Sequence, residues 1–205
     1  MTTSRDLMIT ALDVAESPPA AGDLSLALAG AELIDLLAAE AIRLEDDRIV
    51  PGHPPAMTDR LLDQSAESLV REAPYESVAD WLWRRGLGLA SAYLSALEAE
   101  GQLTRRRRLR LPFGTGRTVL VDSPDRRLAN DRWASNEPVL AALATAVGIT
   151  ARDKGDEGTE EAPGVPDDAV ETVVVAVNEA LLELEAVRQR RSVEQAAFDN
   201  VWRGY

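Results

Sequence analysis

The segment Leu24–Ile42, LSLALAGAELIDLLAAEAI, decides the fold. Leucine and isoleucine occur on so many sides of this segment, with alanine and glycine between them, that a helix here is expected to be buried nearly all round. Glu32 and Asp35 interrupt it, and glutamates interrupt the apolar segment Val170–Val187, so neither segment can span a bilayer. The chain is therefore expected to be a soluble protein built around a central helix.

Further helix signals follow along the chain. Capping residues and terminal glycines mark where these helices begin and end: Thr58, Ser77 and Asp167 or Asp168 before them, Gly101 and Gly148 after them. Apolar positions between these signals recur with a helical spacing. They are Leu61, Leu62, Leu69 and Val70; Leu89, Tyr93 and Leu97; the segment from Pro138 to Val147; Val170, Val173, Val177, Leu181, Leu184 and Val187; and, in a separate last helix, Val193, Ala197 and Val201.

The segment Leu103–Val121 has the pattern of a β-hairpin instead of a helical period. Leu109 and Leu111 alternate with arginines, and Pro112–Gly116 has the composition of a turn. We expect a protruding basic hairpin over about residues 102–121, and it is the only convincing β element of the sequence.

Length and composition favour one domain. The 205 residues suffice for a single core, and aromatic residues make up only 4%, so leucine, alanine and valine must fill that core. We predict one all-α domain over residues 1–205, a helical bundle around the central helix with the single hairpin. Residues 151–166 hold almost no large apolar side chain and are expected to form a mobile loop. No apolar segment follows residues 1–6, so a cytoplasmic location is expected.

No residue pattern supports catalysis, a cofactor or a metal site. The chain has no cysteine, and its single histidine, His53, lies in a proline-rich turn without an identifiable partner. The pairs Asp46–Asp47 and Asp167–Asp168 are typical of turns and caps rather than of a calcium loop. The segment Gly114–Gly116 lacks the third glycine, the lysine and the following helix of a phosphate-binding loop. The sequence therefore predicts a binding protein rather than an enzyme.

Positive charge is concentrated in one part of an acidic chain. The net charge is −13, yet residues 102–133 hold nine arginines and three aspartates, a local charge of +6. Four consecutive arginines, Arg105–Arg108, are followed by Arg110 and Arg117. Such a cluster contacts phosphates, on lipid headgroups or nucleic acid, or it forms a solvated edge that pairs with acidic patches of a second copy. The sequence supports these two interpretations about equally.

Two tryptophans precede two arginines on the helix expected after Ser77. On a helix Trp81 and Trp83 point about 200° apart, so at least one of them is expected in the core. The other, with Arg84 or Arg85, has the composition of a contact at a membrane interface.

Six segments, taken in their order along the chain, form a recognisable pattern. They are Asp6–Leu12, Leu28–Leu36, Ile42–Ile49, Asp59–Ser65, Trp81 and Leu94–Leu103. In this order they resemble the Golgi phosphoprotein 3 family, in detail over roughly the first two thirds of the chain and in pattern for the C-terminal helices. The resemblance implies an all-helical domain with a protruding hairpin that binds membranes peripherally. It also implies self-association through the hairpin and an adaptor role for the tails of glycosyltransferases.

The lipid pocket of that family does not carry over residue by residue. Its eukaryotic members read phosphatidylinositol 4-phosphate through a tryptophan and several arginines. The resemblance places these residues at positions that are neither aromatic nor basic here: Ala20–Gly22, Ala29, Leu87 and Ala90. Arg84 and Arg85 lie about one helical turn away and are candidates to substitute for them.

These observations predict a peripheral membrane or adaptor protein that contacts an anionic phospholipid surface at the inner face of the membrane. Further partners expected are a second copy, bound through the hairpin, and protein clients. The candidate anion-binding residues are Arg84, Arg85, Arg105, Arg106, Arg107, Arg108, Arg110 and Arg117, and the candidate membrane-contact residues are Trp81 and Phe113.

Two alternatives remain at this point. One is a self-associating interaction module without lipid binding. The other is a winged-helix-like DNA-binding protein, in which the arginine run would be the wing. Against DNA, the segment Gly88–Glu100 before the run carries no arginine, lysine, asparagine or glutamine to read base edges and ends in Glu98 and Glu100. The acidic remainder of the chain would also repel a polyanion. Nucleic acid is therefore the least favoured partner.

Overall fold

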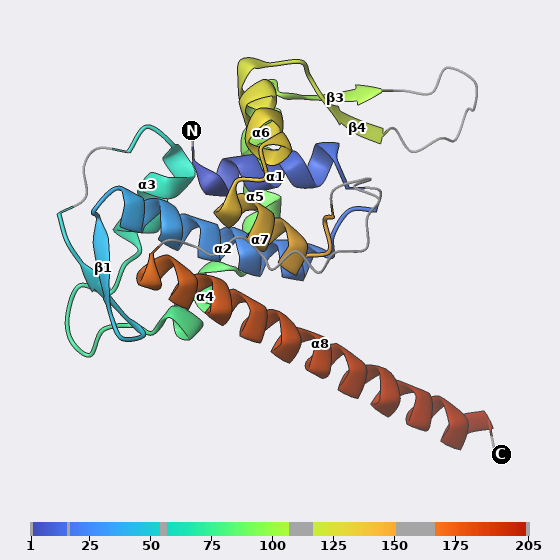
Figure 1. Cartoon of the computed structure of the whole chain (residues 1–205). Helices are drawn as coiled ribbons and strands as arrows, with labels where there is room; N and C mark the ends of the chain where they lie inside the picture. Colours follow the sequence, from blue (N-terminus) through green and yellow to red (C-terminus); the bar gives the residue numbers. More distant parts are fainter. Residues whose placement is uncertain (1, 16, 54–56, 107–116, 151–166, 204–205) are drawn as a thin grey trace, which may run out of the picture.

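The computed structural model of the chain describes residues 2–15, 17–53, 57–106, 117–150 and 167–203. Helices dominate the described part, as the predicted all-α class requires, and that prediction is confirmed. The loop expected over residues 151–166 lies outside the described residues. The elements in chain order are α1 (Thr3–Asp13), α2 (Ala21–Ala38), β1 (Ile42–Glu45), β2 (Arg48–Pro51), α3 (Arg60–Glu67), α4 (Val78–Arg85), α5 (Leu89–Ala99), β3 (Leu103–Arg106), β4 (Arg117–Leu120), α6 (Pro124–Ala134), α7 (Pro138–Ala146) and α8 (Asp168–Arg203) (Figure 1).

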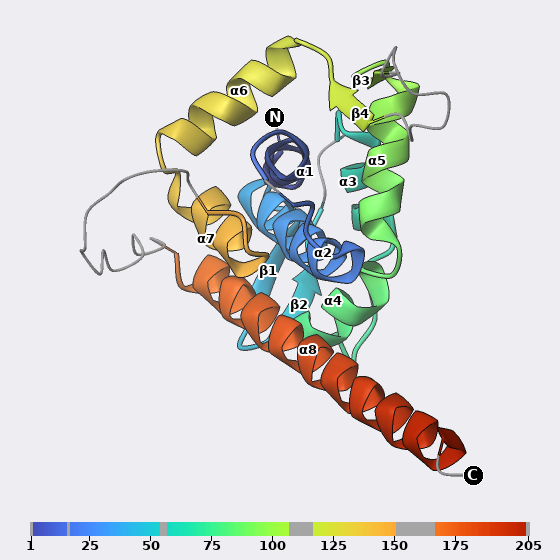
Figure 2. The same ribbon diagram turned by 90° about the vertical axis from the view of Figure 1, so that its right-hand side faces the viewer.

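Helix α2 is the central element. In Figure 2 helices α1, α5, α7 and α8 are arranged around it. Its first turn is exposed at Ala21 and Gly22, and every residue from Leu24 to Ile34 is buried. The apolar residues on all sides of this segment thus each find a packing partner, and the predicted central buried helix is confirmed.

The N-cap residue of α4 is the predicted one, and that of α3 differs from the prediction by one position. The Ser77 hydroxyl accepts a hydrogen bond from the backbone N–H of Asp80 at 3.0 Å, so it caps α4 as predicted. Helix α3 is capped by Asp59, whose carboxylate accepts from the backbone N–H groups of Leu61 and the following residue. Thr58 was predicted in this role, and that prediction is wrong by one residue, because the carboxylate at position 59 accepts two hydrogen bonds from the first turn.

Two apolar stripes end elsewhere than the sequence suggested. Helix α3 stops at Glu67, so Leu69 and Val70, expected on its apolar face, lie beyond its end. The C-terminal part is one continuous helix over Asp168–Arg203, and the separate last helix expected around Val193 is wrong. No proline or glycine interrupts this helix, and it extends past the body of the molecule in both views (Figures 1 and 2).

A second hairpin, β1–β2, corrects the expectation of a single β element. Ile42 pairs with Pro51 and Glu45 with Arg48 in an antiparallel register. The predicted turn pair Asp46–Asp47 joins the two strands, and Asp46 adopts a left-handed φ of 54°. Strands of four residues offer too few alternating positions for the period of two to be recognised.

Gly30 permits the close packing of α2 on α8. A Cβ atom at position 30 would lie 2.3 Å from a methyl group of Val177, which is fully buried. Replacing Gly30 with alanine is therefore expected to lower the free energy of unfolding by about 1–3 kcal/mol, because overpacking a filled core forces the helices apart. Urea denaturation followed by circular dichroism measures this loss.

The Val177→Ala change supplies the matched control for that prediction. In the double variant Gly30→Ala with Val177→Ala the added methyl group fills space that the valine has vacated. The two losses should therefore add to more than the loss of the double variant. Strict additivity would show that the contact between these two positions is not the cause.

Candidate functional site

The β3–β4 hairpin places two arginines opposite each other. The strands pair with Leu103 opposite Leu120, and the Cα partner of Arg106 is Arg117. Directly opposite residues of an antiparallel pair have Cβ atoms about 4.5–5.5 Å apart, so like charges at such positions repel. The hairpin predicted from sequence is present in its two strands. The predicted site residues Arg107, Arg108, Arg110 and Phe113 lie outside the described residues.

The base of this hairpin is fixed to the helical body. Leu120 is buried, and Gln102 donates a hydrogen bond to Asp125 at 2.8 Å. Arg126, in the first turn of α6, donates from Nη2 and Nε to the Asp13 carboxylate at 2.6 and 3.0 Å. These contacts hold the strands so that they extend from the helices, as Figure 1 shows at the upper right.

Arg85, a predicted anion-binding residue, is engaged in a buried ion pair. Its Nε and Nη2 donate to the two carboxylate oxygens of Glu32 at 2.7 and 2.9 Å, and the Glu32 side chain has no exposed surface. The hydroxyl of Tyr93 donates to the same carboxylate at 3.1 Å. Nη2 also donates to the backbone carbonyl of Leu61 at 3.0 Å, so Nε and Nη2 of Arg85 are both engaged inside the protein.

Burial and pairing act in opposite directions on this cluster. Burial raises the pKa of Glu32 above its ordinary value, although hydrogen bonds and the positive charge of Arg85 lower it in part. Burial and the neighbouring carboxylate together raise the pKa of Tyr93 well above its ordinary value. The Glu32 carboxylate therefore depends on Arg85 to remain charged inside the protein.

Arg84 and Trp81 form a second internal contact. Trp81 has no exposed surface, and its indole N–H donates to the backbone carbonyl of Ala29 at 3.2 Å. The Arg84 guanidinium lies 5.1 Å from the centre of the Trp81 ring and donates twice to Glu76 at 2.7 Å. Core packing of Trp81 is confirmed, and membrane contact by Trp81 is wrong, because the side chain that the helix turns outward is Trp83, 39% exposed.

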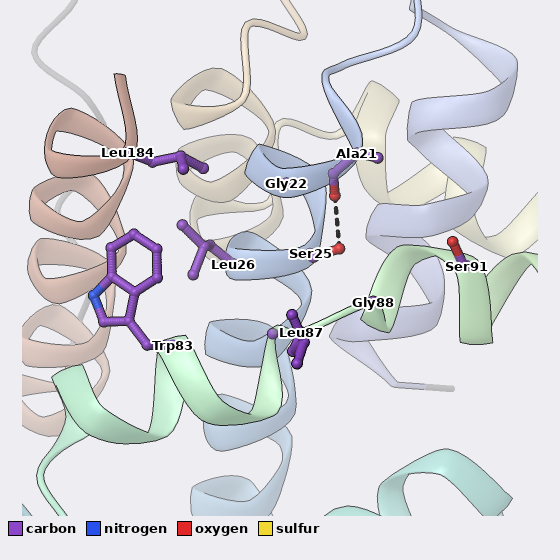
Figure 3. Close-up of a pocket in the computed structure, with 10 residues that line it drawn as sticks. Ala21, Gly22, Ser25, Leu26, Trp83, Leu87, Gly88, Ser91 and Leu184 are labelled. Atoms are coloured by element: carbon purple, nitrogen blue, oxygen red, sulfur yellow. Dashed lines mark hydrogen bonds between the residues drawn. The ribbon is translucent and has the colours of Figure 1, made fainter. Parts of the chain in front are cut away.

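A pocket that was not predicted from the sequence lies where α2, α4 and α8 meet. Figure 3 shows Leu26, Trp83 and Leu184 around this space, each contributed by a different helix. Its volume is about 280 Å³. Leu87, between two glycines in the turn from α4 to α5, is 89% exposed at its edge. A leucine held in a Gly-Leu-Gly turn was the one available signal. The full lining is Ala21, Gly22, Ser25, Leu26, Trp83, Gly86, Leu87, Gly88, Ser91 and Leu184.

The described residues contain neither a metal-binding cluster nor a membrane-spanning helix. No group of three or more histidine, cysteine, aspartate or glutamate side chains in this part of the chain is placed to hold a metal ion. Among the described helices, none combines the length and the apolar composition needed to cross a membrane.

Comparison with known proteins decides the family. The family model described as Golgi phosphoprotein 3 matches residues 4–192, which is most of the chain. The chain belongs to the Golgi phosphoprotein 3 family. Among curated proteins, none matches the chain. Proteins of the Golgi phosphoprotein 3 family are typically lipid or protein adaptors and not enzymes.

The positions assigned to the family's headgroup pocket come together in this Golgi phosphoprotein 3 protein. Ala21, Gly22 and Leu87 line the pocket between α2, α4 and α8. Ala29 on α2 and Ala90 on α5 are buried and do not line it. At the positions where the resemblance implied aromatic and basic side chains, this chain has small and apolar ones.

Proposed function

We propose that this protein is a peripheral membrane adaptor that contacts anionic lipid headgroups through the arginines of the β3–β4 hairpin. The observation that carries the proposal is the register that sets Arg106 opposite Arg117. Two like charges at directly opposite positions are unfavourable by themselves, and an anion between them removes the repulsion. A lipid phosphate is such an anion.

The charge distribution supports the same function. The hairpin arginines belong to a region of net charge +6, whereas the whole chain has a charge of −13. A basic element on an acidic body is turned toward an anionic surface by the field of that surface. The inner leaflet of a cell membrane carries anionic lipids and attracts basic segments by about 1 kcal/mol per arginine near the surface. We therefore place the protein at the inner face of the membrane.

The pocket has no cationic residue in its lining, and this bears on which lipid headgroup the protein recognises. A pocket for a phosphorylated inositol needs cationic donors, and none of the residues that line this pocket is ionisable. Arg84 and Arg85 do not supply these donors, because both guanidinium groups are hydrogen-bonded to glutamates of the chain. Recognition thus rests on negative surface charge and not on a particular headgroup.

Sedimentation of the full chain with lipid vesicles tests the proposal. We expect binding to vesicles that contain phosphatidylglycerol to be at least about tenfold stronger than binding to pure phosphatidylcholine vesicles at low salt. Because salt screens the attraction, the difference should decrease at physiological ionic strength. Equal binding to the two lipids would contradict the proposal, and no binding to either would favour a self-associating protein adaptor.

A further inference from the structure

The pocket between α2, α4 and α8 has the chemistry of a site for hydrocarbon. Its lining consists of leucine, tryptophan, alanine, glycine and two serines. The Ser25 hydroxyl is already engaged, since it donates to the carbonyl of Ala21 at 2.6 Å and accepts from the N–H of Ala90 at 3.0 Å. A volume of about 280 Å³ gives room for roughly nine groups of the size of a water molecule or methylene.

Two large apolar side chains are exposed at the edge of this pocket. Leu87 is 89% exposed and Trp83 is 39% exposed. Tryptophan is the residue that membrane proteins place at the boundary between hydrocarbon and water, because its ring is apolar and its N–H is polar. The Trp83 N–H donates no hydrogen bond to any other described residue, so it is available at such a boundary. An exposed apolar edge beside an apolar pocket marks a contact surface.

Positive charge lies next to that edge on α8. Leu184, Arg188 and Arg191 are spaced at i, i+4 and i+7 and therefore share one face of the helix. The absence of a side chain on Gly22 lets this face approach α2, because a Cβ there would lie 3.1 Å from Nη2 of Arg188 and 3.2 Å from a methyl group of Leu184.

The arginines of this face differ in how they are paired. Arg188 is paired with Asp23, with Nη1 at 2.7 Å from the carboxylate. Arg190 and Arg191 are exposed and form no ion pair within the described part of the chain. A surface with apolar side chains and adjacent free arginines is complementary to an anionic bilayer.

The first turn of α2, which contributes to the pocket, lies on the same side of the molecule as the hairpin strands. In Figure 1 the free end of the β3–β4 strands, the beginning of α2 and the projecting part of α8 all lie on the right-hand side. Ala21 and Gly22, which line the pocket, belong to this beginning of α2.

We infer that the pocket receives one acyl chain of an anionic membrane lipid, with Trp83 and Leu87 at the boundary and the arginines of α8 beside the headgroup. This inference rests on the proposed function, because the hairpin first brings the surface to the bilayer. It adds a hydrocarbon contact to a contact made through charge. The pocket thus binds the opposite end of the lipid from its phosphate.

Fluorescence quenching by brominated lipid tests this inference. The full chain is mixed with phosphatidylglycerol vesicles whose acyl chains carry bromine atoms near their middle, and bound protein is counted by sedimentation. We expect strong quenching of the bound protein that is largely lost in Trp83→Phe. In Ala21→Phe, which fills the pocket from an exposed position of α2, vesicle binding should persist while the quenching of Trp83 falls at least twofold.

The same exposed alanine-to-phenylalanine change on another surface serves as the control. Ala134, at the end of α6, is exposed and does not line the pocket, so Ala134→Phe should keep the full quenching. Bound protein whose quenching is the same in the wild type and in Trp83→Phe would overturn the inference alone. Equal quenching in Ala21→Phe and the wild type would overturn it as well. Protein that binds no phosphatidylglycerol vesicles would overturn the proposed function together with it.

Discussion

Replacing Arg85 with alanine is expected to lower the free energy of unfolding by about 3–5 kcal/mol. The change leaves the Glu32 carboxylate, which has no exposed surface, without the cation that contacts both of its oxygens. A buried charge that loses its partner is not solvated by water in its place. The resulting loss of stability exceeds that caused by most single substitutions. Urea denaturation of the variant and the wild type at pH 7, followed by circular dichroism, measures the difference.

Arg84 supplies the matched control on the same helix. Its side chain is 43% exposed, and it pairs with Glu76, whose side chain is 10% exposed. Arg84→Ala is therefore expected to cost about 1–2 kcal/mol, less than Arg85→Ala, because Arg84 itself is partly solvated and Glu76, unlike Glu32, retains some contact with water. If the two variants lost the same stability, the buried pair would not have the structural role assigned to it.

The loss caused by Arg85→Ala should also depend on pH. Without Arg85, the two largest effects that oppose burial at the Glu32 carboxyl, the hydrogen bond from Arg85 and its positive charge, are both removed. The pKa of Glu32 in the folded variant therefore rises further above that of the unfolded chain. A carboxyl with a raised folded pKa contributes stability below its unfolded pKa, about 4.3 for glutamate, and that contribution is lost as pH rises through the folded pKa. The deficit relative to the wild type should therefore be smaller near pH 4 than at pH 8. A deficit that is the same at both values would contradict this account.

The central helix could be predicted from the sequence, whereas α6 could not. Helix α2 is recognisable because apolar residues occur on every side of it over Leu24–Ile34. Helix α6 buries only Ala129, so it has no apolar stripe to recognise. It is attached instead through ion pairs of Arg126 with Asp13 and of Arg132 with α1, between residues more than one hundred positions apart. Such pairs leave no local pattern in the sequence.

The same limit applies to the candidate site. The sequence shows that Trp81 and Trp83 point to different sides of α4, and it does not show which side faces α2. Likewise Arg85 and Glu32 are 53 positions apart, and only the fold reveals that they form an ion pair. The hairpin arginines were found because consecutive like charges are visible without any knowledge of packing.

Changing Arg105, Arg106, Arg107 and Arg108 together to alanine is expected to weaken binding to anionic vesicles by roughly 30- to 1,000-fold. Each arginine near an anionic surface contributes on the order of 1 kcal/mol, so four of them contribute about 2–4 kcal/mol after screening by salt. The fold should survive, because the hairpin base is held by Leu120, by Gln102 and by Arg126, which the variant retains. Vesicle sedimentation at several lipid concentrations measures the change.

The most direct test of the proposed function compares this variant with one of equal net charge. Four exposed arginines of the body, Arg43, Arg48, Arg60 and Arg71, are changed to alanine in the second variant, and both proteins are sedimented with phosphatidylglycerol vesicles at physiological salt. We predict that the hairpin variant loses binding while the body variant binds within about threefold of the wild type. Equal loss in both variants would show that only the total charge matters, and it would contradict a hairpin that contacts the membrane.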